Sequence, residues 1–173
     1  MTFAPILAAP LAIQLHLATV IPAALLGAFL LLRPKGTAVH QGLGKVWLLL
    51  MVMTAASTFF IHEIRMIGDF SPLHVLSAYV IVGSFRAVAA ARRHDVAGHR
   101  MVVARMYMGG IVVAGMFSFL PGRHLNAAVF DQATTIGTVL AVSVLALFFS
   151  ALAWAALRQL AIGTARKSRQ GAS

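Results

Sequence analysis

Four of the seven histidines fall into two matched pairs. His16 precedes His40 by 24 residues, and His74 precedes His99 by 25 residues. The second pair follows the first by 58 or 59 residues, and the surrounding residues agree, with Leu-His-Leu-Ala-Thr around His16 and Leu-His-Val-Leu-Ser around His74. This pattern predicts a duplicated two-helix unit that carries one histidine near each end. Such a duplication places equivalent imidazoles across a pseudo-two-fold axis, where two of them can bind one ligand.

The chemistry that this arrangement favours is axial ligation of haem iron, for which imidazole is a common protein ligand. A haem lying between helices needs one histidine from each side at the same depth. We therefore expect haem b at such a pair, namely His16 with His74 and, as a second site, His40 with His99. Arg65 and Arg123 again lie 58 residues apart, and they suit the haem propionates through charge-assisted hydrogen bonds.

Two other interpretations of the histidines remain open. A zinc or copper site would use imidazole nitrogens of His16, His62 and His74, although the chain has no compact motif such as two histidines at i and i+4 in this region. Alternatively, the histidines are amphipathic anchors in the headgroup layer, and the protein is a non-enzymatic accessory or scaffold subunit. No residue is singled out as catalytic.

The composition places all of these sites in a membrane protein. The chain of 173 residues is 60% hydrophobic and only 10% charged, and its mean hydropathy is +0.89. That leaves too little polar surface for a water-soluble globule. The net charge of +10 comes from basic residues spread between apolar runs, which is a topology signal and not a nucleic-acid-binding patch. With no cysteine, the chain has no disulfides and no thiolate ligands.

The apolar runs predict the fold class, an all-α integral membrane bundle of four helices from a parallel duplication plus a fifth C-terminal helix. A spanning helix needs about 20 apolar residues, and backbone amides in lipid need partners within their own helix. The predicted spans are roughly 11–32, 43–64, 72–91, 101–120 and 133–157. They form one transmembrane domain over 1–157, with halves at about 11–65 and 69–123, followed by a basic cytoplasmic tail over 158–173.

The distribution of Lys and Arg predicts the orientation. Twelve of the fourteen basic residues lie in or beside the first and third connections and the C-terminal tail, while the other connections hold only Arg65 and Arg123. Because cytoplasmic loops carry the excess of positive charge, we expect the N-terminus outside and the C-terminus in the cytoplasm, in the bacterial inner membrane.

Several short sequence motifs resemble those of one bacterial family of membrane proteins, the domain of unknown function 2306. They are Phe-Ser-Pro-Leu-His-Val-Leu-Ser at 70–77, Gly-His-Arg at 98–100 and Pro-Gly-Arg at 121–123. In the first half, His16 is similar to the family's first histidine. The motif His-Gln-Gly-Leu-Gly at 40–44 is similar to the family's His-Arg-x-Leu-Gly motif, with Gln41 in place of the arginine. The resemblance covers roughly 11–130. It implies no assigned activity, although the helix pattern is similar to that of two-haem b-type membrane cytochromes.

These observations together predict a b-type haem membrane protein with a role in electron transfer. The expected partners are the lipid bilayer, a quinone or a periplasmic redox partner, and further copies of the chain or a larger membrane complex; no nucleic acid is expected. The accessory subunit and the zinc or copper protein are the alternatives.

Overall fold

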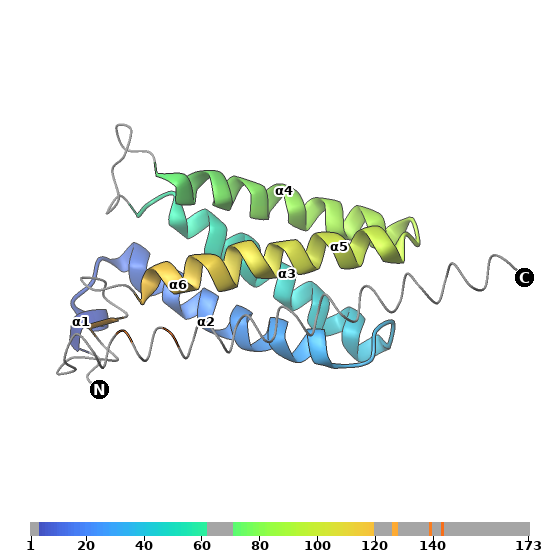
Figure 1. Ribbon diagram of the computed structural model, residues 1–173, viewed down its shortest axis with the longest axis horizontal. Helices are drawn as coiled ribbons and strands as arrows, with labels where there is room; N and C mark the ends of the chain where they lie inside the picture. Colours follow the sequence, from blue (N-terminus) through green and yellow to red (C-terminus); the bar gives the residue numbers. More distant parts are fainter. Residues whose placement is uncertain (1–3, 62–70, 120–125, 128–138, 140–142, 144–173) are drawn as a thin grey trace, which may run out of the picture.

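The computed structural model describes residues 4–61, 71–119, 126–127, 139 and 143, and these residues are helical apart from short connections. A short α1 (Ala4–Leu7) precedes α2 (Leu11–Leu32), α3 (Ala38–Thr58) and α4 (Pro72–Arg92) (Figure 1). A continuous helical run follows, made of α5 (Val96–Met106), the π-helix η1 (Tyr107–Val113) and α6 (Ala114–Ser118). Four segments, namely α2, α3, α4 and the run from α5 to α6, are long and apolar enough to cross a membrane. The predicted all-α membrane fold is confirmed.

Two parts of the prediction are not reached by these residues. The fifth helix over 133–157, apart from 139 and 143, and the tail over 158–173 lie outside the described residues. The internal duplication also stays a prediction.

Capping residues explain where the helices begin. The second long helix starts at Ala38, five residues before the predicted apolar run, because the Thr37 hydroxyl accepts a hydrogen bond from the backbone N–H of His40 at 3.1 Å. The fourth starts at Val96, again ahead of its apolar run, because the Asp95 carboxylate accepts from the Gly98 N–H at 2.9 Å. Both are ordinary N-caps, which satisfy one of the unpaired amides of a first turn.

The helices follow one another as antiparallel neighbours, and α2 also meets η1 through aromatic side chains. Trp47 on α3 donates from Nε1 to the Ala23 carbonyl at 2.9 Å, and the Tyr107 hydroxyl on η1 donates to the Ala24 carbonyl at 3.2 Å. Both rings pack against Gly27, where a Cβ would lie 2.6 Å from Trp47 Nε1. Gly27 therefore permits a close approach of α2 to the rings of Trp47 and Tyr107.

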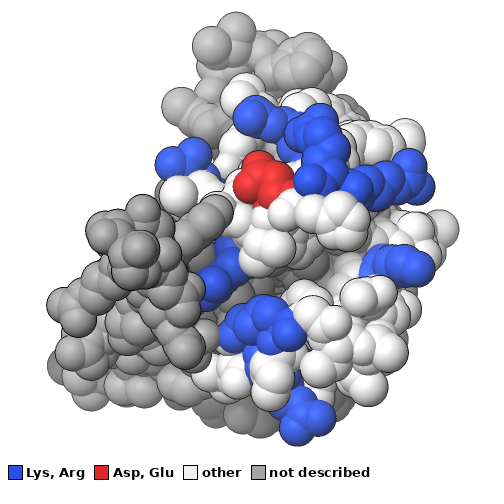
Figure 2. Space-filling view, turned by 90° about the vertical axis from the view of Figure 1, so that its right-hand side faces the viewer, with Lys and Arg blue, Asp and Glu red and all other residues white. Residues whose placement is uncertain are grey.

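The bundle has two chemically different ends. We call the "His16 end" the one where α2 and α4 begin, and the "His40 end" the one that holds the connections 33–37 and 93–95 (Figure 1). Lys and Arg side chains gather on the His40 end (Figure 2). His94 lies in its second connection with a φ of 57°, a left-handed conformation that often ends a helix. His16 and His74 lie at one end, and His40 and His99 at the other, as the spacing predicts.

Candidate ligand site between the helices

A cavity of about 330 Å³ lies at the His16 end between α2, α3, α4 and the run from η1 to α6. Its volume falls at the lower edge of the range of small-molecule sites, about 300–1,000 Å³. Apolar side chains form most of its wall, and the polar groups come from His16, Thr54, Thr58, Ser71, Ser77 and Ser118. The cavity can therefore hold a largely apolar ligand that interacts with one or a few polar groups.

Small residues on the run from η1 to α6 help to keep this cavity open. Gly110, Ala114 and Gly115 line the cavity, and these small side chains leave room between α6 and α2. Gly110 belongs to the π-helix η1, whose wider turn interrupts the α-helical run beside the cavity. Short π-helical segments within α-helices are frequent at functional sites.

The ring of His16 is held on one side by oxygen atoms of α3. Its Nδ1 lies 3.2 Å from the Thr54 carbonyl oxygen, 3.1 Å from Ser57 Oγ and 3.3 Å from Thr58 Oγ1. These three residues lie at i, i+3 and i+4, so one face of α3 presents all three oxygens. The contacts connect α2 to α3 and fix the plane of the imidazole.

The surrounding hydrogen bonds assign the tautomer of His16. The hydroxyls of Ser57 and Thr58 both donate to the Thr54 carbonyl, at 2.8 and 3.0 Å. All three oxygens then offer lone pairs to the imidazole, so Nδ1 carries the proton in the neutral ring. The opposite nitrogen, Nε2, is left with a lone pair on the residue that lines the cavity.

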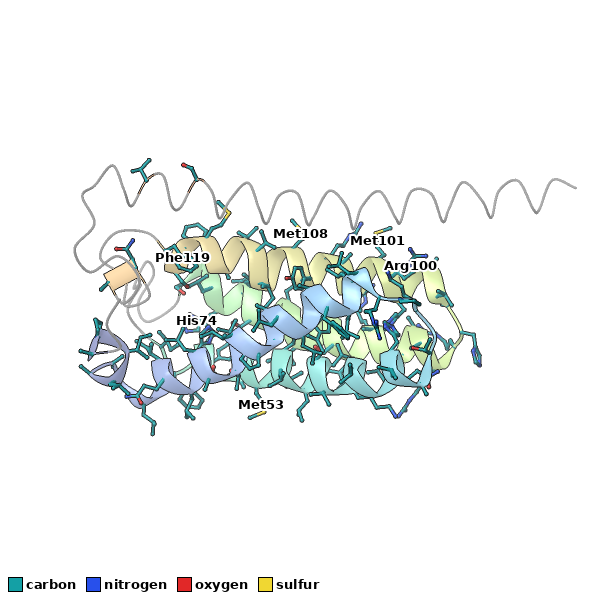
Figure 3. All side chains as sticks on the ribbon, turned by 90° about the horizontal axis from the view of Figure 1, so that it is seen from below. Met53, His74, Arg100, Met101, Met108 and Phe119 are labelled. Carbon is teal, nitrogen blue, oxygen red and sulfur yellow. The ribbon has the colours of Figure 1, made fainter. Side chains whose placement is uncertain are left out.

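His74 is held differently. It is only 4% exposed and lies inside the bundle (Figure 3), with its ring 5.6 Å from that of Phe59. As the third residue of α4, it accepts at Nδ1 the backbone N–H of Ser71 at 2.9 Å, which completes a capping box. In the neutral ring this contact places the proton on Nε2, the reverse of the His16 tautomer. Leu73 and Ser77, on either side of His74 in sequence, line the cavity.

The other two histidines meet at the His40 end. The His99 Nδ1–H donates to the Ala87 carbonyl at 2.9 Å, which fixes that ring as Thr54 fixes His16. His40 lies near enough for the charges of the two imidazoles to interact. Its Nδ1 is buried and has no hydrogen-bond partner among the described residues. The structure therefore places His40 and His99 at the same end of the bundle and holds only His99 by a side-chain hydrogen bond.

Three predicted site residues, His62, Arg65 and Arg123, lie outside the described residues. Within the described part of the chain, no group of three or more His, Cys, Asp or Glu side chains could hold a metal ion. The roles of these three residues and of the zinc or copper site stay predictions.

The sequence reasoning missed the hydroxyl residues that position His16. Besides Ser57 and Thr58, Thr54 donates from Oγ1 to Thr19 Oγ1 at 2.9 Å, which extends the polar contact between α3 and α2. The available signal was the spacing of Thr54, Ser57 and Thr58 on one face of an apolar helix. Polar side chains within a spanning helix commonly form contacts between helices.

The family model described as "Predicted membrane protein (DUF2306)" matches residues 13–154 of the chain. No curated protein and no solved structure matches the chain.

Proposed function

The chain belongs to the family of predicted membrane proteins (DUF2306), and we propose that it holds haem b in the cavity at the His16 end and transfers electrons within the membrane. His16 would hold the haem iron through Nε2, and it is the residue whose hydrogen bonding supports that role best. His74 would be the second ligand; it does not itself line the cavity, although Leu73 and Ser77 on the same helix do.

The observation that carries this proposal is the hydrogen bonding of His16. A histidine that binds a metal through one nitrogen almost always donates its other N–H to a carbonyl or carboxylate, which fixes the tautomer and the ring plane. In His16 the Thr54 carbonyl lies 3.2 Å from Nδ1, and the residue lines a mostly apolar cavity. The arrangement presents a lone pair on a rigid imidazole where a flat apolar ring would lie.

His74 can serve as the second ligand only after a small rearrangement. Its Nδ1 now accepts the Ser71 N–H, so Nε2 carries the proton. Moving that proton to Nδ1 would let the ring donate to Ser71 Oγ, which already lies 3.2 Å away. The buried Ser71 N–H would lose its acceptor, at a cost of about 1–3 kcal/mol. That cost is small beside a metal–ligand bond.

When bound, the haem supplies one-electron chemistry, and the protein supplies the axial ligands and an apolar surrounding that excludes water. We further propose that the His40 end faces the cytoplasm of a bacterial inner membrane, since basic residues gather there. The His16 end then faces a quinone or a periplasmic redox partner. A second haem at His40 and His99 stays a prediction.

An absorbance spectrum of the full chain, purified from haem-replete cells, tests the proposal. We expect a Soret band in the wild type, no band in His16→Ala, and a change from low-spin to high-spin absorption in His74→Ala. His94→Asn is the matched control, because it removes a histidine from a turn and keeps a residue that tolerates the left-handed conformation. A wild type that is folded by circular dichroism but shows no Soret band would overturn the proposal.

A specific observation also favours a second candidate, the non-enzymatic accessory or scaffold subunit. Both rings already have structural roles, because His16 connects α2 to α3 and His74 caps α4. This candidate expects no porphyrin, no zinc or copper by elemental analysis, and a lower melting temperature in His16→Ala. Bound metal without porphyrin would instead identify the zinc or copper site.

A further inference from the structure

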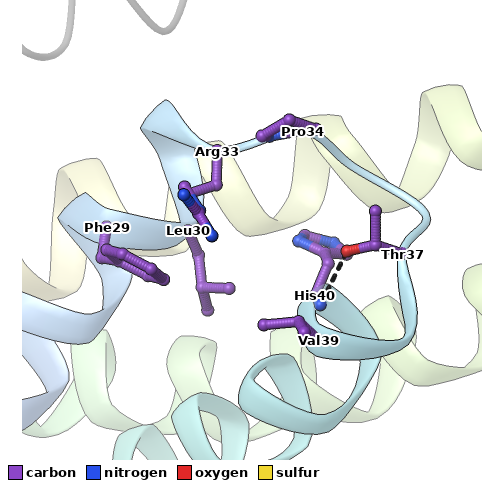
Figure 4. A pocket seen from close by; sticks show the side chains of 7 residues that line it. All are labelled: Phe29, Leu30, Arg33, Pro34, Thr37, Val39 and His40. Atoms are coloured by element: carbon purple, nitrogen blue, oxygen red, sulfur yellow. Dashed lines mark hydrogen bonds between the residues drawn. The ribbon is translucent and has the colours of Figure 1, made fainter.

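A second, smaller cavity of about 250 Å³ lies at the His40 end, beside the connection between α2 and α3. Arg33 and His40 project into the same space from different sides (Figure 4). The remaining wall is formed by Phe29, Leu30, Pro34, Thr37 and Val39. The cavity thus combines a cationic side chain and an imidazole with an apolar wall.

The polar groups of this cavity are incompletely paired. His40 Nδ1 is buried and has no hydrogen-bond partner among the described residues, so no internal contact holds the ring as in the other three described pair histidines. A buried polar atom without a partner is costly. Thr37 accepts at Oγ1 from the His40 N–H, and its own hydroxyl hydrogen can still be donated. Arg33 and the Thr37 hydroxyl can donate hydrogen bonds, and so can the one N–H of a neutral His40 ring, which is the requirement for binding an anion.

The charged side chains around the cavity are mostly positive. Arg33, Lys35, Arg93 and Arg100 belong to this end, whereas Asp95 is the one acidic residue of the described ranges and already caps α5 (Figure 2). Burial, and then the nearby positive charge of Arg100, lower the pKa of Lys35. A cation of the connection between α2 and α3 and one of α5 therefore interact at this end of the bundle.

The surface beside the cavity is apolar. Phe29 is 43% exposed, Leu32 61% and Val39 57%, and they border the same connection. In a membrane protein this surface meets acyl chains, while the helix ends lie at the level of the headgroups. The Arg33 guanidinium lies 5.1 Å from the centre of the Phe29 ring, which holds it over the apolar wall.

We propose that this cavity is a binding site for an anionic phospholipid. The headgroup phosphate lies between Arg33, His40 and Thr37, and the acyl chains run along Phe29 and Val39. Arg33 binds the phosphate through charge-assisted hydrogen bonds. The apolar border favours a lipid over a free phosphate, because only a lipid fills both the cationic and the apolar part. The site does not depend on the haem proposed at the His16 end, because it lies at the opposite end of the bundle.

Native mass spectrometry of the delipidated full chain tests the proposal by titration with phosphatidylglycerol, phosphatidylcholine or inorganic phosphate. We expect phosphatidylglycerol to be retained in preference to phosphatidylcholine, and Arg33→Gln to weaken it about tenfold. Arg93→Gln is the matched control, because it removes an equal charge from the same end outside the cavity, and we expect less than about a twofold effect. His40→Asn should also weaken the binding of phosphatidylglycerol.

Three results would overturn the proposal. Equal losses of phosphatidylglycerol affinity in Arg33→Gln and Arg93→Gln would mean that the lipid is attracted to the basic surface as a whole. Equal retention of the two lipids would remove the role of the anionic headgroup. Inorganic phosphate that binds at least as tightly as phosphatidylglycerol would identify a site for a soluble anion. A folded wild type without a Soret band would refute the haem proposal alone.

Discussion

Replacing Gly27 by alanine should destabilise the bundle strongly. The added Cβ would lie 2.6 Å from Trp47 Nε1 and 2.6 Å from Tyr107 Cε2, so both rings must move. Each ring also donates a hydrogen bond to α2, at 2.9 Å for Trp47 and 3.2 Å for Tyr107. Overpacking costs about 1–3 kcal/mol, and losing both hydrogen bonds adds about 1–3 kcal/mol, against a gain in helix propensity of about 1 kcal/mol. The expected net loss is about 1–5 kcal/mol.

The measurement is thermal unfolding of the purified chain in detergent, followed by circular dichroism. Gly44→Ala is the matched control, because Gly44 lies in α3 and a Cβ there meets no atom within 4 Å. It gains the same helix propensity without a clash, and we expect it to melt at or above the wild-type temperature. If Gly27→Ala melted at the same temperature as Gly44→Ala, the close contact of α2 with Trp47 and Tyr107 would be wrong.

Two further predictions concern the His40 end. Asp95→Ala should cost about 1 kcal/mol in thermal unfolding, because it removes the N-cap of α5; Asp95→Asn should keep most of the stability, and equal losses in both would count against the cap. Arg100→Gln should raise the pKa of Lys35 toward its ordinary value of 10.5, since one cause of the lowering is removed while burial remains. The pH dependence of Lys35 acylation, read by peptide mass spectrometry, checks this, and an unshifted curve would contradict it. Because folding lowers the pKa of Lys35, the unfolded chain holds more protons between the two pKa values, so this residue makes stability rise with pH there.

The sequence was sufficient to predict the fold class and the centres of the helices. It predicted less accurately where the helices begin. The predicted run over 11–32 has the bounds of α2. The next predicted run began five residues late, because hydropathy detects the apolar centre of a helix and not the polar turn that starts it. His40 and Gln41 belong to such a turn, and Thr37 is the cap that begins it. Asp95 plays the same part for α5.

The candidate site was less accessible from sequence. Spacing alone singled out His16 and His74, and it also placed them at the same end of the bundle. The tautomer of each ring depends on its hydrogen-bond partners, and those of His16 lie 38 to 42 residues away on α3. The size of the cavity depends on the distance between α2 and the run from η1 to α6. No local pattern of residues encodes that distance. Sequence therefore named the candidate rings, and only the packing of the helices shows which nitrogen each ring can offer.

The matched spacing of the histidines does not imply matched chemistry at the two ends. His16 and His99 each have an Nδ1 held by a backbone carbonyl, at 3.2 and 2.9 Å, which is the preparation that a metal ligand needs. Their predicted partners differ, because His74 already caps a helix and His40 has a buried, unpaired Nδ1 beside Arg33. A positively charged surrounding repels a cationic metal and attracts an anion. The same residue type can therefore serve a cofactor at the His16 end and a lipid phosphate at the His40 end.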